Sequence, residues 1–224
     1  MAILETKQLT YFYQDGENRR YILDDISVSF ERGQFYSILG QSGSGKTTFL
    51  SLISALEKPK GGEILYNEKN IEEIGYDTYR RNSVGIVFQS YNLIPYMTAV
   101  ENVMLAMETT DNPIAGNKKE IAYNLLDYIG IVKTKADRLV TRLSGGEQQR
   151  VAVARALASD VDLILADEPT GNLDEETEKD IIGIFKRLAH EHQKCVIVVT
   201  HSKEIAEQSD SVLYLRKGVL QAYE

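Results

Sequence analysis

An eight-residue stretch in the first quarter of the chain constrains the fold most strongly. Residues 40–47 read Gly-Gln-Ser-Gly-Ser-Gly-Lys-Thr, which matches the pattern G-x-x-x-x-G-K-[ST] at every fixed position. An apolar run at 34–39 precedes this stretch, and a segment with helical spacing at 47–56 follows it. The sequence therefore predicts a strand, a glycine-rich turn and a helix in direct succession, which is typical of an α/β protein.

A loop of this composition is suited to binding phosphate groups. Its glycines let backbone amides turn inward around phosphate oxygens, and the following helix adds the positive end of its dipole. We expect Lys46 to reach the β- and γ-phosphates of a nucleotide and the Thr47 hydroxyl to bind Mg²⁺. The predicted nucleotide-binding residues of this segment are Gly40, Gln41, Ser42, Gly43, Ser44, Gly45, Lys46, Thr47 and Thr48.

The rest of the chain alternates strands with helices and is interrupted once by a helical stretch. Strands are predicted at 3–13, 22–30, 34–39, 63–66, 84–88, 163–166, 196–200 and 212–215. Helices are predicted at 47–56, 118–129, 144–158 and 175–191, and 98–132 is helical with a polar break at 111–113. Apolar strands that alternate with helices imply a mostly parallel sheet.

Two adjacent acids, Asp167 and Glu168, follow the apolar run 163–166. Ligands gather at the carboxyl ends of parallel strands. An aspartate there can hold Mg²⁺, and the next acid can polarise an attacking water as a general base. Adjacent acids after a strand are also common on surfaces, so the pair predicts a nucleotide site only together with the upstream phosphate loop.

A second helix start combines a capping box with two glycines. Residues 143–150 read Leu-Ser-Gly-Gly-Glu-Gln-Gln-Arg. Ser144 as N-cap and Glu147 three residues later would account for a capping box alone. Gly145 and Gly146 in the first turn weaken a helix, but they let its amides approach an anion closely. The segment is thus a second predicted phosphate-binding helix end.

Composition and charge exclude several other classes of protein. No apolar run approaches the 18 residues of a spanning helix, and the start of the chain does not read as a signal peptide. The formal net charge of −8 disfavours binding to nucleic acid. The only cysteine, Cys195, lies in an apolar run and is expected to be buried in a strand. These features together are typical of a cytoplasmic protein, or of one held at a membrane by a partner.

The order of the motifs resembles that of the ATPase subunits of ABC transporters. The phosphate loop is followed by Gln89 after a strand, then by Leu-Ser-Gly-Gly-Glu, the pair Asp167-Glu168, and His201. The resemblance covers essentially the whole chain. It implies one α/β domain, 1–224: a P-loop core with a mostly parallel sheet, an antiparallel β subdomain and a helical insertion subdomain at about 90–158. It also implies ATP hydrolysis with bound ATP and Mg²⁺.

The resemblance further implies a role for each motif. Two subunits would dimerise head to tail in the ATP-bound state, each ATP lying on one phosphate loop and under the partner's Leu-Ser-Gly-Gly-Glu helix. The implied catalytic residues are Lys46, Gln89, Glu168 and His201, and the implied metal ligands are Thr47, Gln89 and Asp167. Nucleotide contacts across the interface would come from Ser144, Gly145, Gly146, Glu147 and Asp174.

Some of these residues have a simpler alternative role. Asp174 precedes a predicted helix and can serve as its N-cap, a role that is compatible with an interface contact. A histidine after a strand, such as His201, can be a solvent-facing turn residue. The family places an aromatic ring on the adenine. Among Tyr11, Phe12 and Tyr13, the last fits best because it directly precedes a polar turn; a core aromatic is the alternative.

The segment 168–174, Glu-Pro-Thr-Gly-Asn-Leu-Asp, resembles the branch of macrolide exporters, lipoprotein-release ATPases and the cell-division ATPase FtsE. This branch implies export or mechanotransmission at the cytoplasmic face of the cell membrane. It also implies a separate permease of the FtsX or MacB type, with an extracytoplasmic adaptor as a possible further partner. In the family, the region after Gln89 meets the permease, although ordinary packing would also explain its apolar residues.

Two other functions remain as alternatives on the sequence. One is an FtsE-like role in cell division. The other is a soluble ABC ATPase that acts on nucleic acid or ribosomes, but the chain has neither a long coiled-coil insertion nor a second cassette, and its net charge of −8 fits an RNA or DNA surface poorly. The sequence does not identify a transported substrate.

Overall fold

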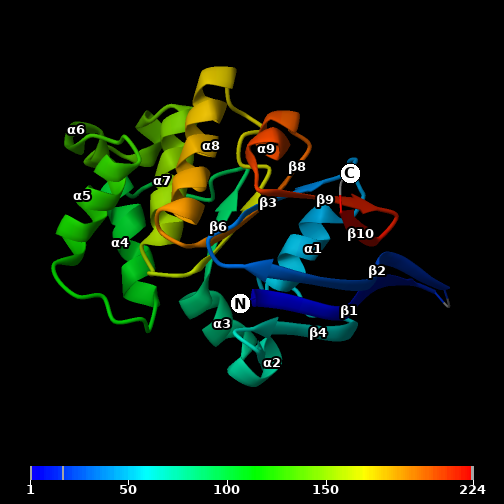
Figure 1. The fold of residues 1–224 in the computed structure, drawn as a ribbon. Coiled ribbons are helices and arrows are strands. Elements are labelled where there is room, and N and C mark those ends of the chain that lie inside the picture. Colours follow the sequence, from blue (N-terminus) through cyan, green and yellow to red (C-terminus); the bar gives the residue numbers. More distant parts are fainter. Residues whose placement is uncertain (1, 17, 223–224) are drawn as a thin grey trace.

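A six-stranded sheet forms the centre of the molecule, with the strand order β10-β9-β3-β8-β7-β6 (Figure 1). The structure is a computed structural model that describes residues 2–16 and 18–222. The strands are β3 (Phe35–Leu39), β6 (Val84–Phe88), β7 (Leu163–Asp167), β8 (Cys195–Thr200), β9 (Ser211–Arg216) and β10 (Val219–Ala222). All neighbouring pairs are parallel except β9 with β10, so the predicted mostly parallel sheet is confirmed.

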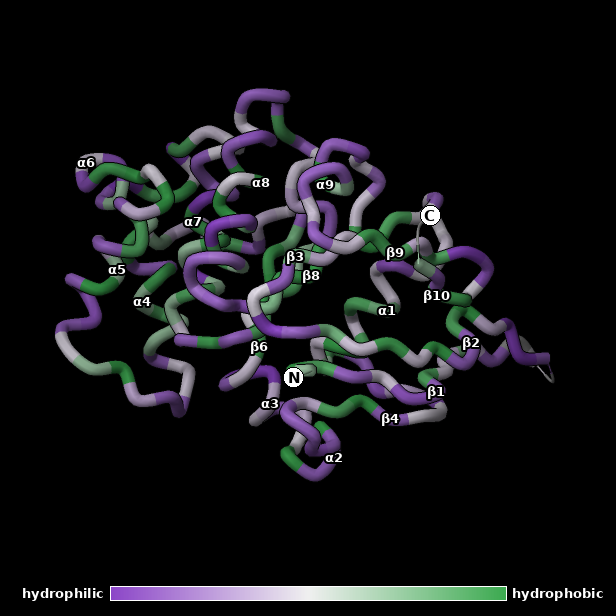
Figure 2. The backbone as a smooth tube through the Cα atoms, in the orientation of Figure 1, coloured by the Kyte–Doolittle hydropathy of each residue, from purple (hydrophilic) through white to green (hydrophobic). Residues whose placement is uncertain are grey.

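The inner strands are apolar throughout because both faces of the sheet are covered. Side chains alternate between faces along a strand. In β7, Leu163 and Leu165 belong to one hydrophobic cluster, whereas Ile164 and Ala166 belong to the other. Cys195 is fully buried in β8, as predicted. Figure 2 shows hydrophobic segments concentrated along these inner strands and hydrophilic segments along the outside of the molecule.

A second, antiparallel sheet has the strand order β2-β1-β4-β5. Its strands are β1 (Ala2–Asp15), β2 (Asn18–Glu31), β4 (Gly61–Tyr66) and β5 (Lys69–Asn70). The long hairpin β1–β2 extends beyond the two strands predicted at 3–13 and 22–30. This sheet lies beside α1 (Lys46–Ile53), and the two share a hydrophobic cluster that contains Leu4, Leu23 and Phe49 (Figure 1).

Helices pack together at the opposite end of the molecule, on the left in Figure 1. They are α4 (Ala99–Thr109), α5 (Lys118–Tyr128), α6 (Lys133–Ala136) and α7 (Gly145–Leu157), with a short 3₁₀ turn at Val140–Arg142. Helix α4 begins with a capping box, since Thr98 and Glu101 bond reciprocally. The structure also confirms helices at 175–190 (α8, Glu175–His190) and after the phosphate loop.

Several elements were not predicted from the sequence, among them α2 (Ile71–Ile74), α3 (Tyr76–Ser83), α9 (Lys203–Gln208) and β10. In α3 only Tyr79 is buried, so the helix shows no apolar periodicity. Among the described helices, none combines the length and apolar character needed to cross a bilayer. The division into one domain, 1–224, with a helical subdomain at about 90–158, stays a prediction.

Candidate nucleotide-binding site

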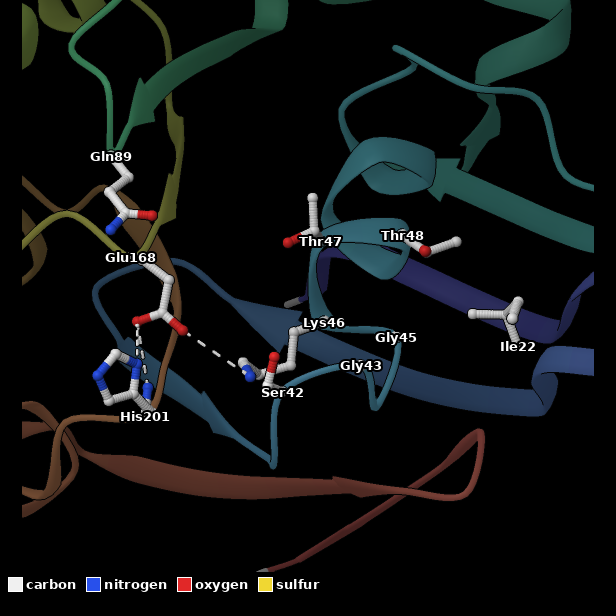
Figure 3. A pocket seen from close by; sticks show the side chains of 10 residues that line it. All are labelled: Ile22, Ser42, Gly43, Gly45, Lys46, Thr47, Thr48, Gln89, Glu168 and His201. Atoms are coloured by element: carbon white, nitrogen blue, oxygen red, sulfur yellow. Dashed lines mark hydrogen bonds and ion pairs between the residues drawn. The ribbon is translucent and has the colours of Figure 1, made fainter. Parts of the chain in front are cut away.

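A cavity of about 600 Å³ lies at the carboxyl ends of the central strands. Figure 3 shows Gln89, Glu168 and His201 on one side of it and Lys46 and Thr47 on the other. The lining residues are Ile22, Ser42, Gly43, Gly45, Lys46, Thr47, Thr48, Gln89, Glu168 and His201. Motif residues that are far apart in the sequence thus meet at one edge of the sheet.

The phosphate loop joins β3 to α1 in a conformation that requires glycine. Gly43 and Gly45 have φ angles of 77° and 103°, which side chains with a Cβ rarely adopt. At Gly40, a Cβ would lie 2.5 Å from the Ser44 hydroxyl and 2.7 Å from the carbonyl oxygen of Leu215. The loop therefore folds back tightly, as a backbone cradle for an anion does.

Lys46 is held with its ammonium inside this loop, and its exposed fraction is only 8%. Its Nζ donates to the carbonyl oxygens of Gly40, at 2.7 Å, and Gln41, at 3.3 Å. The same Nζ lies 3.8 Å from Oε1 of Glu168 across the cavity. A buried cation is costly unless an anion or hydrogen-bond acceptors surround it. The arrangement is therefore suited to receive phosphate oxygens.

Oxygen ligands suited to Mg²⁺ lie at the start of α1 and the end of β7. The Thr47 hydroxyl donates to Oδ1 of Asp167 at 3.3 Å. Burial raises the pKa of Asp167, the negative charge of Glu168 adds to the rise, and the Thr47 hydrogen bond and the charge of Lys46 oppose it. A divalent cation would compensate for these two crowded carboxylates, so the residues fit the ion.

Within residues 2–16 and 18–222, no group of three or more His, Cys, Asp or Glu side chains could hold a metal ion. Mg²⁺ usually binds to one or two protein groups together with substrate phosphates and water. Gln89 lines the cavity and supplies an amide oxygen there. Thr47, Asp167 and Gln89 are the residues that would hold the ion.

Three contacts from the end of β8 and the residue after it hold the side chain of Glu168. Its Oε2 accepts from the Thr200 hydroxyl at 3.1 Å and the His201 backbone amide at 3.2 Å, and it lies 2.9 Å from His201 Nδ1. The backbone of Glu168 has a φ of 46°, a left-handed conformation that is uncommon for residues with a Cβ. The carboxylate is thus fixed at the cavity wall, opposite Lys46.

The loop after Gln89 connects the cavity with the predicted second phosphate site. The backbone oxygen of Gln89 accepts from Asn172 at 3.4 Å. Two residues further on, the Tyr91 hydroxyl lies so close to Gly145 that a Cβ there would come within 2.8 Å of it. Gln89, the segment 171–172 and the start of α7 are therefore linked by direct contacts within one chain.

The Leu-Ser-Gly-Gly-Glu residues do not line the cavity of their own chain. Ser144 caps α7 and forms the predicted capping box with Glu147. Asp174 caps α8, with Oδ1 accepting from the Thr177 amide at 3.0 Å. None of Ser144, Gly145, Gly146, Glu147 and Asp174 is a lining residue. A contact between them and a nucleotide on this phosphate loop would have to come from a second subunit.

The aromatic residues of the β1–β2 hairpin separate into a buried and an exposed set. Tyr11 is 5% exposed and Tyr13 is 55% exposed, and their rings meet edge to face with centroids 5.4 Å apart. Tyr13 is thus available for stacking, but it does not line the cavity, whereas Ile22 on the neighbouring strand does. Ile22 was not predicted, because an isolated apolar residue in a strand carries no sequence signal for a site.

A sequence profile of the ABC transporter family matches residues 23–171 of the chain. The chain belongs to the ABC transporter family. It is 49% identical over 218 residues to the uncharacterized ABC transporter ATP-binding protein YclH of Bacillus subtilis, covering 97% of this chain and 95% of that protein. It is also 40% identical to the macrolide export ATP-binding/permease protein MacB of Aggregatibacter actinomycetemcomitans, covering 97% of this chain but 34% of MacB.

Solved ABC cassettes share the whole fold. A dimeric structure of the ATP-binding cassette MJ0796, described as a post-hydrolysis state bound to ADP and Pi, matches with a TM-score of 0.89 and 37% identity, covering 99% of this chain and 97% of that chain. MJ0796 is an ABC transporter ATP-binding protein of Methanocaldococcus jannaschii. This ABC transporter chain is accordingly an α/β ATP-binding subunit with ATPase activity.

Proposed function

We propose that the chain drives export, or a movement of an extracytoplasmic domain, through a separate permease of the FtsX or MacB type. The ATPase part of the proposal rests on the wall of three groups, Gln89, Glu168 and His201, facing Lys46 across one cavity. This geometry suits the hydrolysis of a γ-phosphate. The similarity to MacB, whose name assigns it to macrolide export, supports the export direction.

In this mechanism, Glu168 acts as the general base. Its carboxylate accepts a proton from a water molecule, the water oxygen bonds to the γ-phosphorus of ATP, and the bond to the β–γ bridging oxygen breaks to leave ADP and phosphate. Lys46 stabilises charge on the phosphate oxygens. His201 and Gln89 orient the groups around the water. Bound Mg²⁺ would neutralise charge on the β- and γ-phosphates.

The second phosphate-binding helix end supports a head-to-tail homodimer. Ser144 and Gly146 would reach the γ-phosphate bound to the partner, and Asp174 would cross the same interface. A two-fold interface of this kind is self-complementary, so each subunit supplies both halves of a site. Tyr13 would stack on the adenine. The other proposed partners are the permease, which places the subunit at the cytoplasmic face of the membrane, and an extracytoplasmic adaptor; nucleic acid is not among them.

A substituted general base tests both the chemistry and the dimer. Glu168→Gln should bind ATP but not hydrolyse it, and should form a dimer with saturating Mg-ATP that light scattering detects. Lys46→Ala is the matched control and should neither hydrolyse ATP nor dimerise. A monomeric Glu168→Gln protein under saturating Mg-ATP would contradict the dimer, and unchanged turnover of either variant would contradict the assignment of the site.

Partner identification tests the export function. Tagged Glu168→Gln should be purified in mild detergent with Mg-ATP from the membranes of its own cells, and its partners identified by mass spectrometry. A four-helix permease with a large extracytoplasmic domain is the expected result. A six-helix importer permease would contradict the assignment to the exporter branch but not the ATPase mechanism. Ribosomal or other soluble partners alone would contradict the transport function.

A further inference from the structure

Glu178, which belongs to none of the sequence motifs, connects the two loops that carry Glu168 and His201. It lies one turn into α8 and is half-buried. Its Oε1 accepts from the Thr170 hydroxyl at 2.9 Å and from the Ser202 hydroxyl at 2.8 Å, which is the shorter of two contacts that this hydroxyl makes, the other being with Oε2 of Glu204 at 3.1 Å. One carboxylate oxygen thus receives a hydrogen bond from each loop. We refer to Thr170, Glu178 and Ser202 as the Glu178 bridge.

The hydrogen bond from Thr170 to Glu178 holds the loop that follows Glu168. Thr170 is 6% exposed and lies two residues after Glu168. Within this loop the amide of Gly171 donates to the carbonyl oxygen of Glu168 at 3.2 Å, and the amide of Leu173 donates to that of Thr170 at 3.0 Å. A shift of Thr170 would therefore move the backbone on which the Glu168 carboxylate stands.

The hydrogen bond between Ser202 and Glu178 is also connected to the Glu168 carboxylate, through Thr200. The amide of Ser202 donates to the Thr200 hydroxyl at 3.0 Å, and this hydroxyl donates to Oε2 of Glu168 at 3.1 Å. His201, between the two, contacts the same oxygen through its amide and its ring. The hydrogen bonds from Glu178 through both loops thus close a ring around Glu168.

We propose that Glu178 is a positioning residue for ATP hydrolysis: it fixes the distance between the general base Glu168 and His201. This proposal rests on the catalytic role assigned to Glu168 above. Glu178 itself does not line the cavity, so it acts through the two loops. Hydrogen bonds to a carboxylate are about twice as strong as those between neutral groups, which suits a residue that must hold two loops at once.

The side chain of Glu178 is not needed to begin helix α8. Asp174 is the N-cap, and its side chain accepts from the amide of Thr177. The backbone amide of Glu178 already donates to the carbonyl oxygen of Asp174 at 2.9 Å. Loss of the Glu178 carboxylate therefore removes the bridge while the cap and first turn of α8 remain.

The test measures steady-state ATP hydrolysis by the purified chain for Glu178→Ala and Glu178→Gln. We expect kcat of Glu178→Ala to fall about ten- to hundredfold, the range for a displaced catalytic group, with KM for ATP changed less than about twofold. Glu178→Gln keeps a carbonyl oxygen that accepts both hydrogen bonds and should retain kcat within about threefold. Glu176→Ala, an exposed acid on the same helix, is the matched control and should be unchanged.

Two outcomes would overturn the bridge: a Glu178→Ala kcat equal to that of wild type, or a Glu178→Gln protein as slow as Glu178→Ala. Thr170→Val preserves shape without the hydroxyl and should reproduce the loss even if Glu178→Ala does not fold; a Thr170→Val protein of full activity would also overturn it. Glu168→Gln is assayed alongside. Turnover by Glu168→Gln would overturn the general base, whereas an inactive Glu168→Gln beside a fully active Glu178→Ala would overturn only the bridge.

Discussion

At the predicted second phosphate site, packing against neighbouring side chains leaves room only for glycine at Gly145 and Gly146. Gly146 lies in the first turn of α7, against the first turn of α8. A Cβ there would be 2.4 Å from Cγ2 and 3.4 Å from Oγ1 of Thr177. The absence of a side chain at Gly146 lets the start of α7 pack directly against the start of α8, which Asp174 caps. At this residue, the glycine thus serves the contact between two motifs of the same chain.

Gly146→Ala should therefore destabilise the chain even without nucleotide. The methyl group overlaps with Thr177, and overpacking of this kind costs about 1–3 kcal/mol. Chemical denaturation measures the change in the free energy of unfolding. Thr177→Ser, which removes Cγ2 and retains the hydroxyl bonded to Asp174, should restore most of the loss in the double variant.

Gly183→Ala is the matched control for that change. Gly183 is also helical, in α8, but the atom nearest to a Cβ added there would be Nη1 of Arg187 at 3.9 Å, the end of a flexible side chain. Alanine should here stabilise the chain by up to about 1 kcal/mol through helix propensity alone. Equal destabilisation at both positions would show that the Thr177 contact does not govern Gly146.

At the scale of elements, the strands of the central sheet and the longer helices could be predicted because their patterns are local. The apolar runs at 163–166 and 196–199 and the capping box at Ser144 each carry their own signal. The elements that were not predicted lack such a local signal. Helix α3 buries only Tyr79, and β10 is an edge strand that pairs with β9. Tertiary contacts determine the secondary structure of such segments. These contacts cannot be inferred from local patterns in a single sequence.

Glu147 makes the start of α7 sensitive to pH. The ammonium of Lys135, whose Nζ is 2.5 Å away, lowers the pKa of Glu147, and the Ser144 amide and hydroxyl lower it further. A carboxyl whose pKa is lowered in the folded state stabilises it fully above the unfolded-state pKa, about 4.3. This contribution is lost as the pH falls through the lower, folded-state pKa.

Glu147→Gln should accordingly reduce the free energy of unfolding at pH 7 by about 0.5–1 kcal/mol, since glutamine can still complete the capping box but loses the ion pair. Denaturant titrations at several pH values should show the difference shrinking as the pH falls below about 4. Lys135→Ala should reproduce this pH dependence. A difference that stays constant down to about pH 3 would contradict the ionic origin.

The guanidinium group of Arg155 anchors the middle of the loop after Gln89. Arg155 of α7 donates to the carbonyl oxygens of Tyr91, at 3.0 Å, and Asn92. Both residues have positive φ angles, 61° and 49°, so the loop needs such an anchor. Burial lowers the pKa of Arg155, which is consistent with a side chain enclosed between the loop and the helix.

Arg155→Met should release this loop while α7 remains folded. Two carbonyl oxygens exchange their donor for water, a net loss of about 0.5–1.5 kcal/mol for each hydrogen bond, and the amides at 89–94 should exchange faster with deuterium. Arg150→Met is the matched control, because Arg150 lies on the same helix but bonds to Ile129 and Asp180. Equal exchange at 89–94 in both variants would show that Arg155 does not anchor the loop.

For the whole molecule, the sequence indicated which residues meet at one cavity better than it indicated how they are connected. Lys46, Thr47, Gln89, Glu168 and His201 all line one cavity, because their motifs follow strands that end at the same edge of a parallel sheet. The supporting contacts of Thr200 and Glu178 had no signal. A threonine or glutamate outside a motif is recognisable only once the fold brings two loops together.

The net charge of the chain should oppose its own dimerisation. Each subunit carries a formal charge of −8, so head-to-tail association brings like charges together and binding of ATP adds more. The repulsion between such subunits acts over several tens of ångströms at low ionic strength, where the Debye length is about 30 Å at 0.01 M, and it is screened when the length falls to about 8 Å at 0.15 M.

The association constant of Glu168→Gln with Mg-ATP should therefore rise roughly tenfold between about 0.01 and 0.15 M salt, as expected for screened repulsion between net charges of this size. Sedimentation or light scattering over a range of protein concentrations measures it. This direction is opposite to that of an interface governed by local ion pairs, which salt weakens. A constant that falls with salt would show that pairs of opposite charge across the interface outweigh the overall repulsion between the subunits.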